Sequence, residues 1–274
     1  MTNHPDVPQS ERHKNVEFTG AQHLRDALHS AETEPSVEKA AGRISAWYEA
    51  LGPRLGAYLT NPNVVLTLAN ARGFTEFATS DFTQDDVETF ARLNALSQPQ
   101  GIYFEPHIIE NDGMKRNYVE LINLPGLEYT SSRTRLPGVP RYGATEGREG
   151  MNNWNTATQR AVDAGREHGQ YPPETASIST KSIVVASGVA RGYPDEAIMA
   201  VLQETDRRTT QVPFSTYYSC EQPNYSYSPS DEGTISQHVE AWGRLLGTYY
   251  RSATHAPLES NEEFRRAREA ANES

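Results

Sequence analysis

Apolar residues recur at helical spacing in the first part of the chain. One set, spaced as i, i+3, i+4 and i+7, predicts an amphipathic helix with a buried aromatic pair: Ile44, Trp47, Tyr48 and Leu51. Gly52-Pro53 follows and is expected to end that helix. A second helical run is predicted over about Val64 to Phe77. A third follows Asp85-Asp86, which we interpret as its N-cap.

Helical spacing returns toward the C-terminal end. Ile178 to Val189 is predicted to be a helix or a buried apolar segment, and Pro194 begins another helix. The buried face of that helix is expected to comprise Ile198, Val201 and Leu202. One apolar stripe then marks a longer helix: Ile235, Val239, Trp242, Leu246 and Tyr249. Ser260 to Glu263 forms a capping box for a final polar helix.

Other segments have no regular apolar pattern. Leu124 to Gly150 contains three prolines and five glycines and is expected to be extended and irregular. A polar helix is expected at about Asn153 to His168. Arg207 to Gly233 has too few aliphatic residues to supply a core of its own. No convincing series of alternating strands is visible, so the pattern predicts a mainly α fold.

The chain is expected to have three parts. These are an N-terminal arm at 1–35, a helical core at 36–205 and a C-terminal arm at 206–274 with one or two helices. Hydrophobic residues make up 36% of the 274 residues, which is lean for an enzyme and agrees with long extended arms.

Cysteine content and hydropathy limit the setting of the protein. Cys220 is the single cysteine, so an intrachain disulfide is excluded and a reducing, intracellular setting is favoured. No apolar run has the length of a membrane span, and Met1 to Pro35 lacks the hydrophobic segment of a signal peptide. We therefore expect no membrane partner.

Local charge runs against the charge of the whole chain between Met114 and Asp163. This stretch has seven basic groups and five acidic ones, although the formal net charge of the protein is -11. A cationic stretch within an acidic chain suits a protein that binds an anion and repels other partners. The alternative interpretation is a solvated face with scattered arginines.

Candidates for catalysis are weak. His107 and Glu110 are three residues apart and both side chains could point at one metal ion, but an ordinary surface pair is the favoured interpretation. The sequence has no Gly-rich phosphate loop, no nucleophile elbow and no CxxC motif. We expect no catalytic residue, no metal, no cofactor and no small-molecule substrate, and we predict that the protein is not an enzyme.

Several short motifs occur in a fixed order from Trp47 to Gly247. They are Trp47-Tyr48-Glu49-Ala50, Thr79-Ser80, Pro106 with Ile108 to Asn111 and Arg116, Tyr129 with Arg133, Pro140 to Gly143, Asn153 with Arg160 and Asp163, and Leu245 to Gly247. In this order and at these intervals, the chain resembles the coat proteins of potyviruses and their flexuous filamentous relatives.

The resemblance implies a capsid protein that polymerises into a flexible helical filament and encloses single-stranded genomic RNA without sequence specificity. It implies that the N-terminal arm docks on the neighbouring subunit, that the C-terminal arm runs into the filament lumen, and that the protein occurs in the virion and the host cell cytoplasm. The serine, arginine and aspartate of the family's RNA groove match Ser80 or Thr79, Arg116 and Asp163. Three further arginines are expected at the RNA: Arg133, Arg141 and Arg160.

The chemistry of the groove residues agrees with that role. Arg116 offers phosphate a bidentate fork, Ser80 offers a hydroxyl, and Asp163 can accept a hydrogen bond from a 2′-hydroxyl. Their alternative roles are a helix-surface arginine, a helix cap and an ion-pair partner of Arg160. Two other functions stay open, namely an enzyme that processes RNA or a small molecule, and an RNA-free cellular scaffold.

Overall fold

The computed structural model describes residues 33–78, 82–111, 114–136, 178–202, 207–214, 224–253 and 261–274. Contacts divide the chain into two units, Met1–Glu34 and Pro35–Ser274, and the elements described here belong to the second. These residues are mostly helical, as predicted, and a small antiparallel sheet accompanies the helices. The arm predicted at 1–35 lies almost entirely outside the described residues, as does the helix predicted at 153–168.

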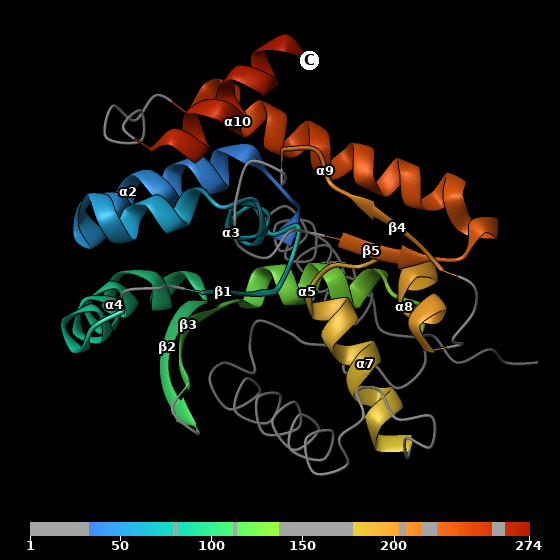
Figure 1. The fold of residues 1–274 in the computed structure, drawn as a ribbon, viewed down its shortest axis with the longest axis horizontal. Helices are drawn as coiled ribbons and strands as arrows, with labels where there is room; N and C mark the ends of the chain where they lie inside the picture. The colour runs from blue at the N-terminus through green and yellow to red at the C-terminus, as the bar shows by residue number, and fades with distance from the viewer. Residues whose placement is uncertain are drawn as a thin grey trace, which may run out of the picture. The chain divides into compact units, whose positions relative to one another are not determined.

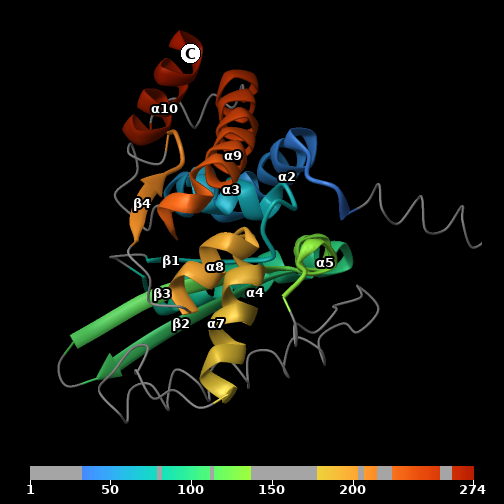
Figure 2. The ribbon, with the colours of Figure 1, turned by 90° about the vertical axis from the view of Figure 1, so that its right-hand side faces the viewer.

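The helices are α2 (Val37–Gly56), α3 (Pro62–Leu68), α4 (Gln84–Ser97), α5 (Leu124–Arg133), α7 (Ile178–Ala190), α8 (Asp195–Leu202), α9 (Glu232–Ser252) and α10 (Glu262–Glu273). The strands are β1 (Phe74–Ala78), β2 (Ile102–Asn111), β3 (Met114–Asn123), β4 (Arg208–Gln211) and β5 (Asn224–Tyr227). Figures 1 and 2 show α3 between α9 on one side and strands β1 to β3 on the other. Helix α2 packs on α3, α4 and α9, so one core joins early and late parts of the chain.

Helix α2 confirms the first predicted helix. Ser36 caps it by accepting a hydrogen bond from the Lys39 amide at 3.4 Å. The predicted apolar face is buried: Ile44, Trp47, Tyr48 and Leu51. The stop expected at Gly52-Pro53 is a kink instead. Gly52 breaks the helical geometry with a φ of 71°, and the helix resumes at Pro53 because proline suits the first turn of a helix.

The run predicted as one helix over Val64 to Phe77 is a helix followed by a strand. Asn70, with a left-handed φ of 68°, stands just after α3 and turns the chain out of the helix. At Gly73 a Cβ would collide with Leu127 of α5, so glycine allows the close approach of the two segments. β1 then pairs with β3. This tertiary pairing overrides the helical spacing of the sequence.

Helix α4 confirms the third predicted helix but has a different cap. Thr83 is the N-cap, and Asp86 completes a capping box by accepting a hydrogen bond from the Thr83 amide at 2.8 Å. The interpretation of Asp85-Asp86 as the cap is therefore wrong. Asp86 also forms an ion pair with Arg54, which ties α4 to α2.

Strands β1, β2 and β3 correct the prediction of a fold without a series of strands. Their order is β1-β3-β2, all antiparallel, and the two long strands pair from Ile102 with Asn123 to Asn111 with Met114. One face of this sheet lies in the core: Phe77, Phe104, Val119 and Leu121. Pro106 fits within β2 because an edge strand tolerates a residue without an amide hydrogen.

The first part of the segment predicted to be irregular, Leu124 to Gly150, is helix α5. The side chain of Asn123 caps the helix by accepting a hydrogen bond from the Gly126 amide at 3.2 Å. Pro125 occupies the first turn, where proline is favourable. The Asn123 cap and the position of Pro125 favour a helix here, although the glycine and proline content of the segment predicted an irregular structure. Residues 137–150 lie outside the described residues.

Helices α7 and α8 confirm the helices predicted at Ile178 to Val189 and after Pro194. In α8 the buried residues are Ala197, Ile198 and Ala200. Val201 and Leu202, which were predicted to be buried, are only half-buried. The β4–β5 hairpin forms in the segment predicted to lack its own core, and its Tyr225 lies in the shared core.

The residues predicted as a C-terminal arm, 206–274, contain two helices that pack into the core. Helix α9 buries most of its predicted stripe: Ile235, Trp242, Leu246 and Tyr249. From the same helix, the Tyr250 hydroxyl donates to the Thr60 carbonyl at 2.9 Å. Helix α10 confirms the final helix, but its cap is Asn261, one residue after the predicted Ser260.

Candidate functional site

Two of the residues predicted to contact RNA lie in the described part of the chain. Arg116 is in β3, where its backbone pairs with Ile109, so it is not the helix-surface arginine of the alternative interpretation. Arg133 is the exposed last residue of α5, and its guanidinium carbon lies 5.2 Å from the centre of the Tyr129 ring. The other predicted residues lie outside the described residues: Thr79, Ser80, Arg141, Arg160 and Asp163.

The face of the sheet opposite the core carries three aligned glutamates, called here the acidic row. Glu76 of β1 and Glu105 of β2 are both direct cross-strand partners of Glu120 in the central strand β3. All three residues are half-buried. Like charges directly opposite each other on neighbouring strands are destabilising, so this row favours a compensating positive charge.

Arg191 compensates one end of the acidic row. It follows the last residue of α7, and its Nη2 atom lies 3.2 Å from Oε1 of Glu76. The guanidinium also lies over the Phe74 ring, 5.4 Å from its centre. Helices α5 and α7 cover the neighbouring part of this face and bury Ile122. The ion pair therefore neutralises Glu76 and leaves the charges of the other two glutamates.

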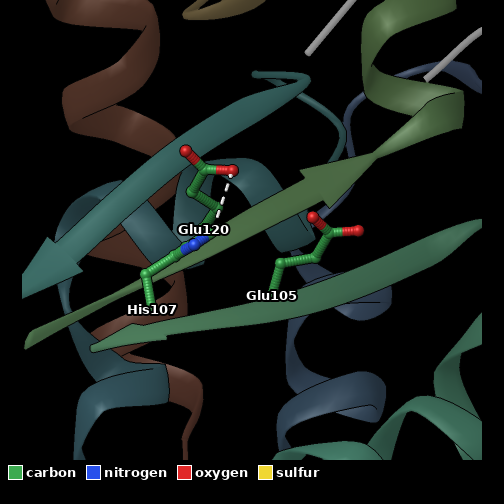
Figure 3. A group of neighbouring side chains, drawn as sticks. All are labelled: Glu105, His107 and Glu120. Atoms are coloured by element: carbon green, nitrogen blue, oxygen red, sulfur yellow. Dashed lines mark ion pairs between the residues drawn. The ribbon is translucent and has the colours of Figure 1, made fainter. Parts of the chain in front are cut away.

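His107 lies beside the other end of the acidic row (Figure 3). It is two positions after Glu105 in β2, so the two side chains share a face of the strand. Its Nε2 atom lies 3.4 Å from Oε2 of Glu120. Nε2 is buried and has no hydrogen bond of good geometry with any described residue. One ligand atom from each of Glu105, His107 and Glu120, the Glu–His–Glu cluster, lies within 4.8 Å of the others.

Two neighbouring residues hold the cluster in place. Tyr118 is the cross-strand partner of His107, and the two rings stack with centroids 4.8 Å apart and an interplanar angle of 21°. Asn94 of α4 donates to the Phe104 carbonyl at 2.7 Å and accepts from the Phe104 amide at 2.8 Å. These two bonds fix the edge strand at the residue before Glu105, as a neighbouring strand would.

The carboxylates favour positive charge on the imidazole. The contact with Glu120 is the main cause of the raised pKa of His107. Partial burial opposes this effect, and the charges of Glu105 and Glu76 add to it. An imidazole nitrogen and two carboxylates are also groups that bind metal cations. The cluster can thus accommodate either a proton or a cation.

The sequence pair His107 and Glu110 is not the pair that the structure brings together. Both residues lie in β2, and positions three apart in a strand are on opposite faces. His107 meets Glu120 across the hairpin instead. A signal for this pairing is present in the sequence, because Asp112-Gly113 is the dipeptide typical of a two-residue hairpin turn.

Comparison with known proteins gives no match for this chain. No protein-family model, no curated protein and no solved structure matches it. Among the described residues, no helix combines the length and the apolar character needed to cross a membrane.

Proposed function

We propose that the protein is a coat subunit that polymerises into a flexible helical filament around single-stranded RNA. The observation that carries this proposal is the fixed order of short motifs from Trp47 to Gly247, which resembles that of flexuous filamentous virus coat proteins. Repeated contact between unlike surfaces generates an open helix.

The packing of motif residues supports the same proposal. Trp47 of the first motif and Leu246 of the last are buried in one core cluster. Trp47 also packs edge-on against Phe104, with ring centroids 5.7 Å apart. Motifs that are far apart in the sequence therefore contribute to one folded subunit. A helical core that joins the first and the last motif suits a subunit that must pack repeatedly along a strand.

Arg116 and Arg133 are the described candidates for RNA contact. Arginine binds phosphate through a fork that reads no sequence, as the coating of a whole genome requires. Arg133 is exposed and has the Tyr129 ring beside it, and an aromatic ring next to a cation suits the stacking of a nucleotide base. Further candidates are Thr79, Ser80, Arg141, Arg160 and Asp163.

Nuclease protection tests the role of Arg116. In full-length protein assembled with single-stranded RNA, Arg116→Ala is expected to lose most of the protection, because a charge-assisted contact of about 1.5–3 kcal/mol is lost from each subunit. Arg116→Lys should restore it only in part, since an ammonium group lacks the guanidinium fork. Thermal melting of the unassembled subunit should stay unchanged in both variants.

Arg244→Ala is the matched control. Arg244 lies on α9, is largely exposed and has an ion pair with Glu240 at 3.6 Å. Arg244→Ala should leave nuclease protection at the level of the parent protein. Full protection by Arg116→Ala would contradict the assignment, as would an equal loss in the control. If the protein is instead an RNA-free scaffold, the parent protein should not protect RNA from nuclease.

A further inference from the structure

We propose that Glu105, His107 and Glu120 bind one divalent first-row transition-metal cation, for which Zn²⁺ is the probe. The site lies on the face of the sheet away from the main core (Figure 3). It is independent of the proposed coat function, because it rests on the geometry and charge of three side chains and on no residue assigned to RNA.

The spacing of the ligand atoms suits one metal ion. Ligands of a tetrahedral ion with bonds of about 2.1 Å lie about 3.4 Å apart. Nε2 of His107 and Oε2 of Glu120 are already 3.4 Å apart. The third ligand atom, from Glu105, lies within 4.8 Å of the other two. A rotation of the half-buried Glu105 side chain brings it into range, and the fourth position stays open for water.

Charge along the sheet favours a cation at this place. Glu120 stands directly between Glu76 and Glu105 in the register of the three strands. Arg191 neutralises Glu76, and Glu105 has no ion pair or hydrogen bond with another described residue. A divalent cation would offset the two remaining carboxylate charges. It would also bind the buried Nε2 atom of His107, whose polar neighbour among the described residues is the Glu120 carboxylate at 3.4 Å.

The site is held by regular structure. Two ligands come from the edge strand β2 and one from the central strand β3, and these strands pair over their full length. Tyr118 stacks on the imidazole and restricts its orientation. Ligands on paired strands are positioned more accurately than ligands on loops, which lowers the cost of assembling the site around a cation.

The ligand set decides the kind of cation. Imidazole with carboxylates suits Zn²⁺ and other first-row divalent ions. Mg²⁺ and Ca²⁺ prefer oxygen ligands only, and Mg²⁺ keeps much of its water. Zn²⁺ is therefore expected to bind and Mg²⁺ is expected not to compete.

Isothermal titration calorimetry of the full-length chain with Zn²⁺ tests the proposal. The parent protein is expected to bind Zn²⁺, and Glu105→Gln, His107→Gln and Glu120→Gln should each weaken one binding event at least tenfold, because each removes a direct ligand. The control Glu88→Gln removes an exposed carboxylate of α4 and should bind as the parent does. The chain has eight histidines, and Zn²⁺ can also bind at others of them. Each binding event of a variant is therefore compared with the corresponding event of the parent protein.

Circular dichroism and thermal melting show whether each variant folds. Glu105→Gln is the safest variant, because its carboxylate holds no described hydrogen bond or ion pair and its change leaves the strand backbone intact. The proposal is overturned if the parent does not bind Zn²⁺, or if Glu105→Gln and Glu120→Gln fold and bind Zn²⁺ with parental affinity. The proposal would also be overturned if Mg²⁺, at the same concentration as Zn²⁺, displaced Zn²⁺ from the site.

Discussion

Two histidines of this chain lie equally close to an aromatic ring but in opposite surroundings. The ring centroid of His107 is 4.8 Å from that of Tyr118, and the ring centroid of His238 is 4.8 Å from that of Trp242. The first pair lies on the sheet beside carboxylates. The second lies on α9 among aromatic rings, with the buried Arg72 guanidinium 5.6 Å from the Trp242 ring centre.

These surroundings move the two pKa values in opposite directions. Glu120 is the main cause of a raised pKa at His107. Burial is the main cause of the lowered pKa of His238, which falls from 6.5 to about 4. A hydrogen bond with the Gly192 backbone acts to raise this pKa, and the charge of Arg133 acts to lower it. Aromatic contact alone therefore does not decide the chemistry of an imidazole. Neighbouring charge and solvent decide whether it attracts cations or packs as a neutral ring.

The largest expected effect comes from removing the aromatic partner in the buried region. Trp242→Ala should reduce the free energy of unfolding by about 3–5 kcal/mol, because it leaves a cavity among close-packed rings. The matched change Tyr118→Ala should cost roughly 1 kcal/mol, since Tyr118 is only half-buried. Urea unfolding at neutral pH measures both. Equal losses would contradict the difference between the two regions.

The next effect is the pH dependence of stability due to His238. The unfolded chain takes up a proton near pH 6.5 and the folded chain only near pH 4, so stability is full above pH 6.5 and falls as the pH drops through this window. The difference between the two pKa values corresponds to a loss of about 3 kcal/mol in the free energy of unfolding between pH 6.5 and pH 4. Urea unfolding at several pH values should show a smaller loss in His238→Phe. An unchanged slope in that variant would show that His238 is not the group responsible.

The smallest effect concerns the pKa of His107 itself. Glu120→Gln removes the main cause of the raised pKa, so the pKa of His107 should fall toward its ordinary value while that of His238 stays the same. An NMR titration of the imidazole protons, in the presence of a chelator, measures both values. The control Glu88→Gln should change neither. A His107 pKa that does not respond to Glu120→Gln would contradict the described geometry.

The helices were largely predictable because their apolar faces repeat at helical spacing. The stripe of α2 and most of the stripe of α9 are buried as predicted, around Trp47 and Trp242. Their ends were less predictable, because caps depend on local hydrogen bonds. Asn261 rather than Ser260 caps α10, and Thr83 rather than Asp85-Asp86 is the N-cap of α4.

The strands were missed because β2 shows no clean alternation of apolar and polar residues. Its face toward the core includes Phe104, but the opposite face begins with Tyr103, which packs against a second apolar cluster. Both faces are partly covered at that end, so apolar residues occur in succession. Pro106 does not interrupt β2, because β2 is an edge strand and an edge strand tolerates proline.

The Glu–His–Glu cluster depends on strand register, which helical spacing does not reveal. Glu105 and Glu120 meet because Asn111 pairs with Met114, and a slip of one residue would move Glu120 to the opposite face. The dipeptide Asp112-Gly113 is the sequence signal from which this register could have been predicted, because it is typical of two-residue hairpin loops. The ion pair of Glu76 with Arg191 joins residues far apart in sequence and follows only from the packing of α7.

Negative-stain electron microscopy of the full-length chain with single-stranded RNA tests the proposed coat function most directly. The coat proposal predicts long flexible filaments, which contain RNA by their absorbance ratio and protect it from nuclease. Monomers or small rings, with the absorbance ratio of protein alone and RNA that stays open to nuclease, would contradict it.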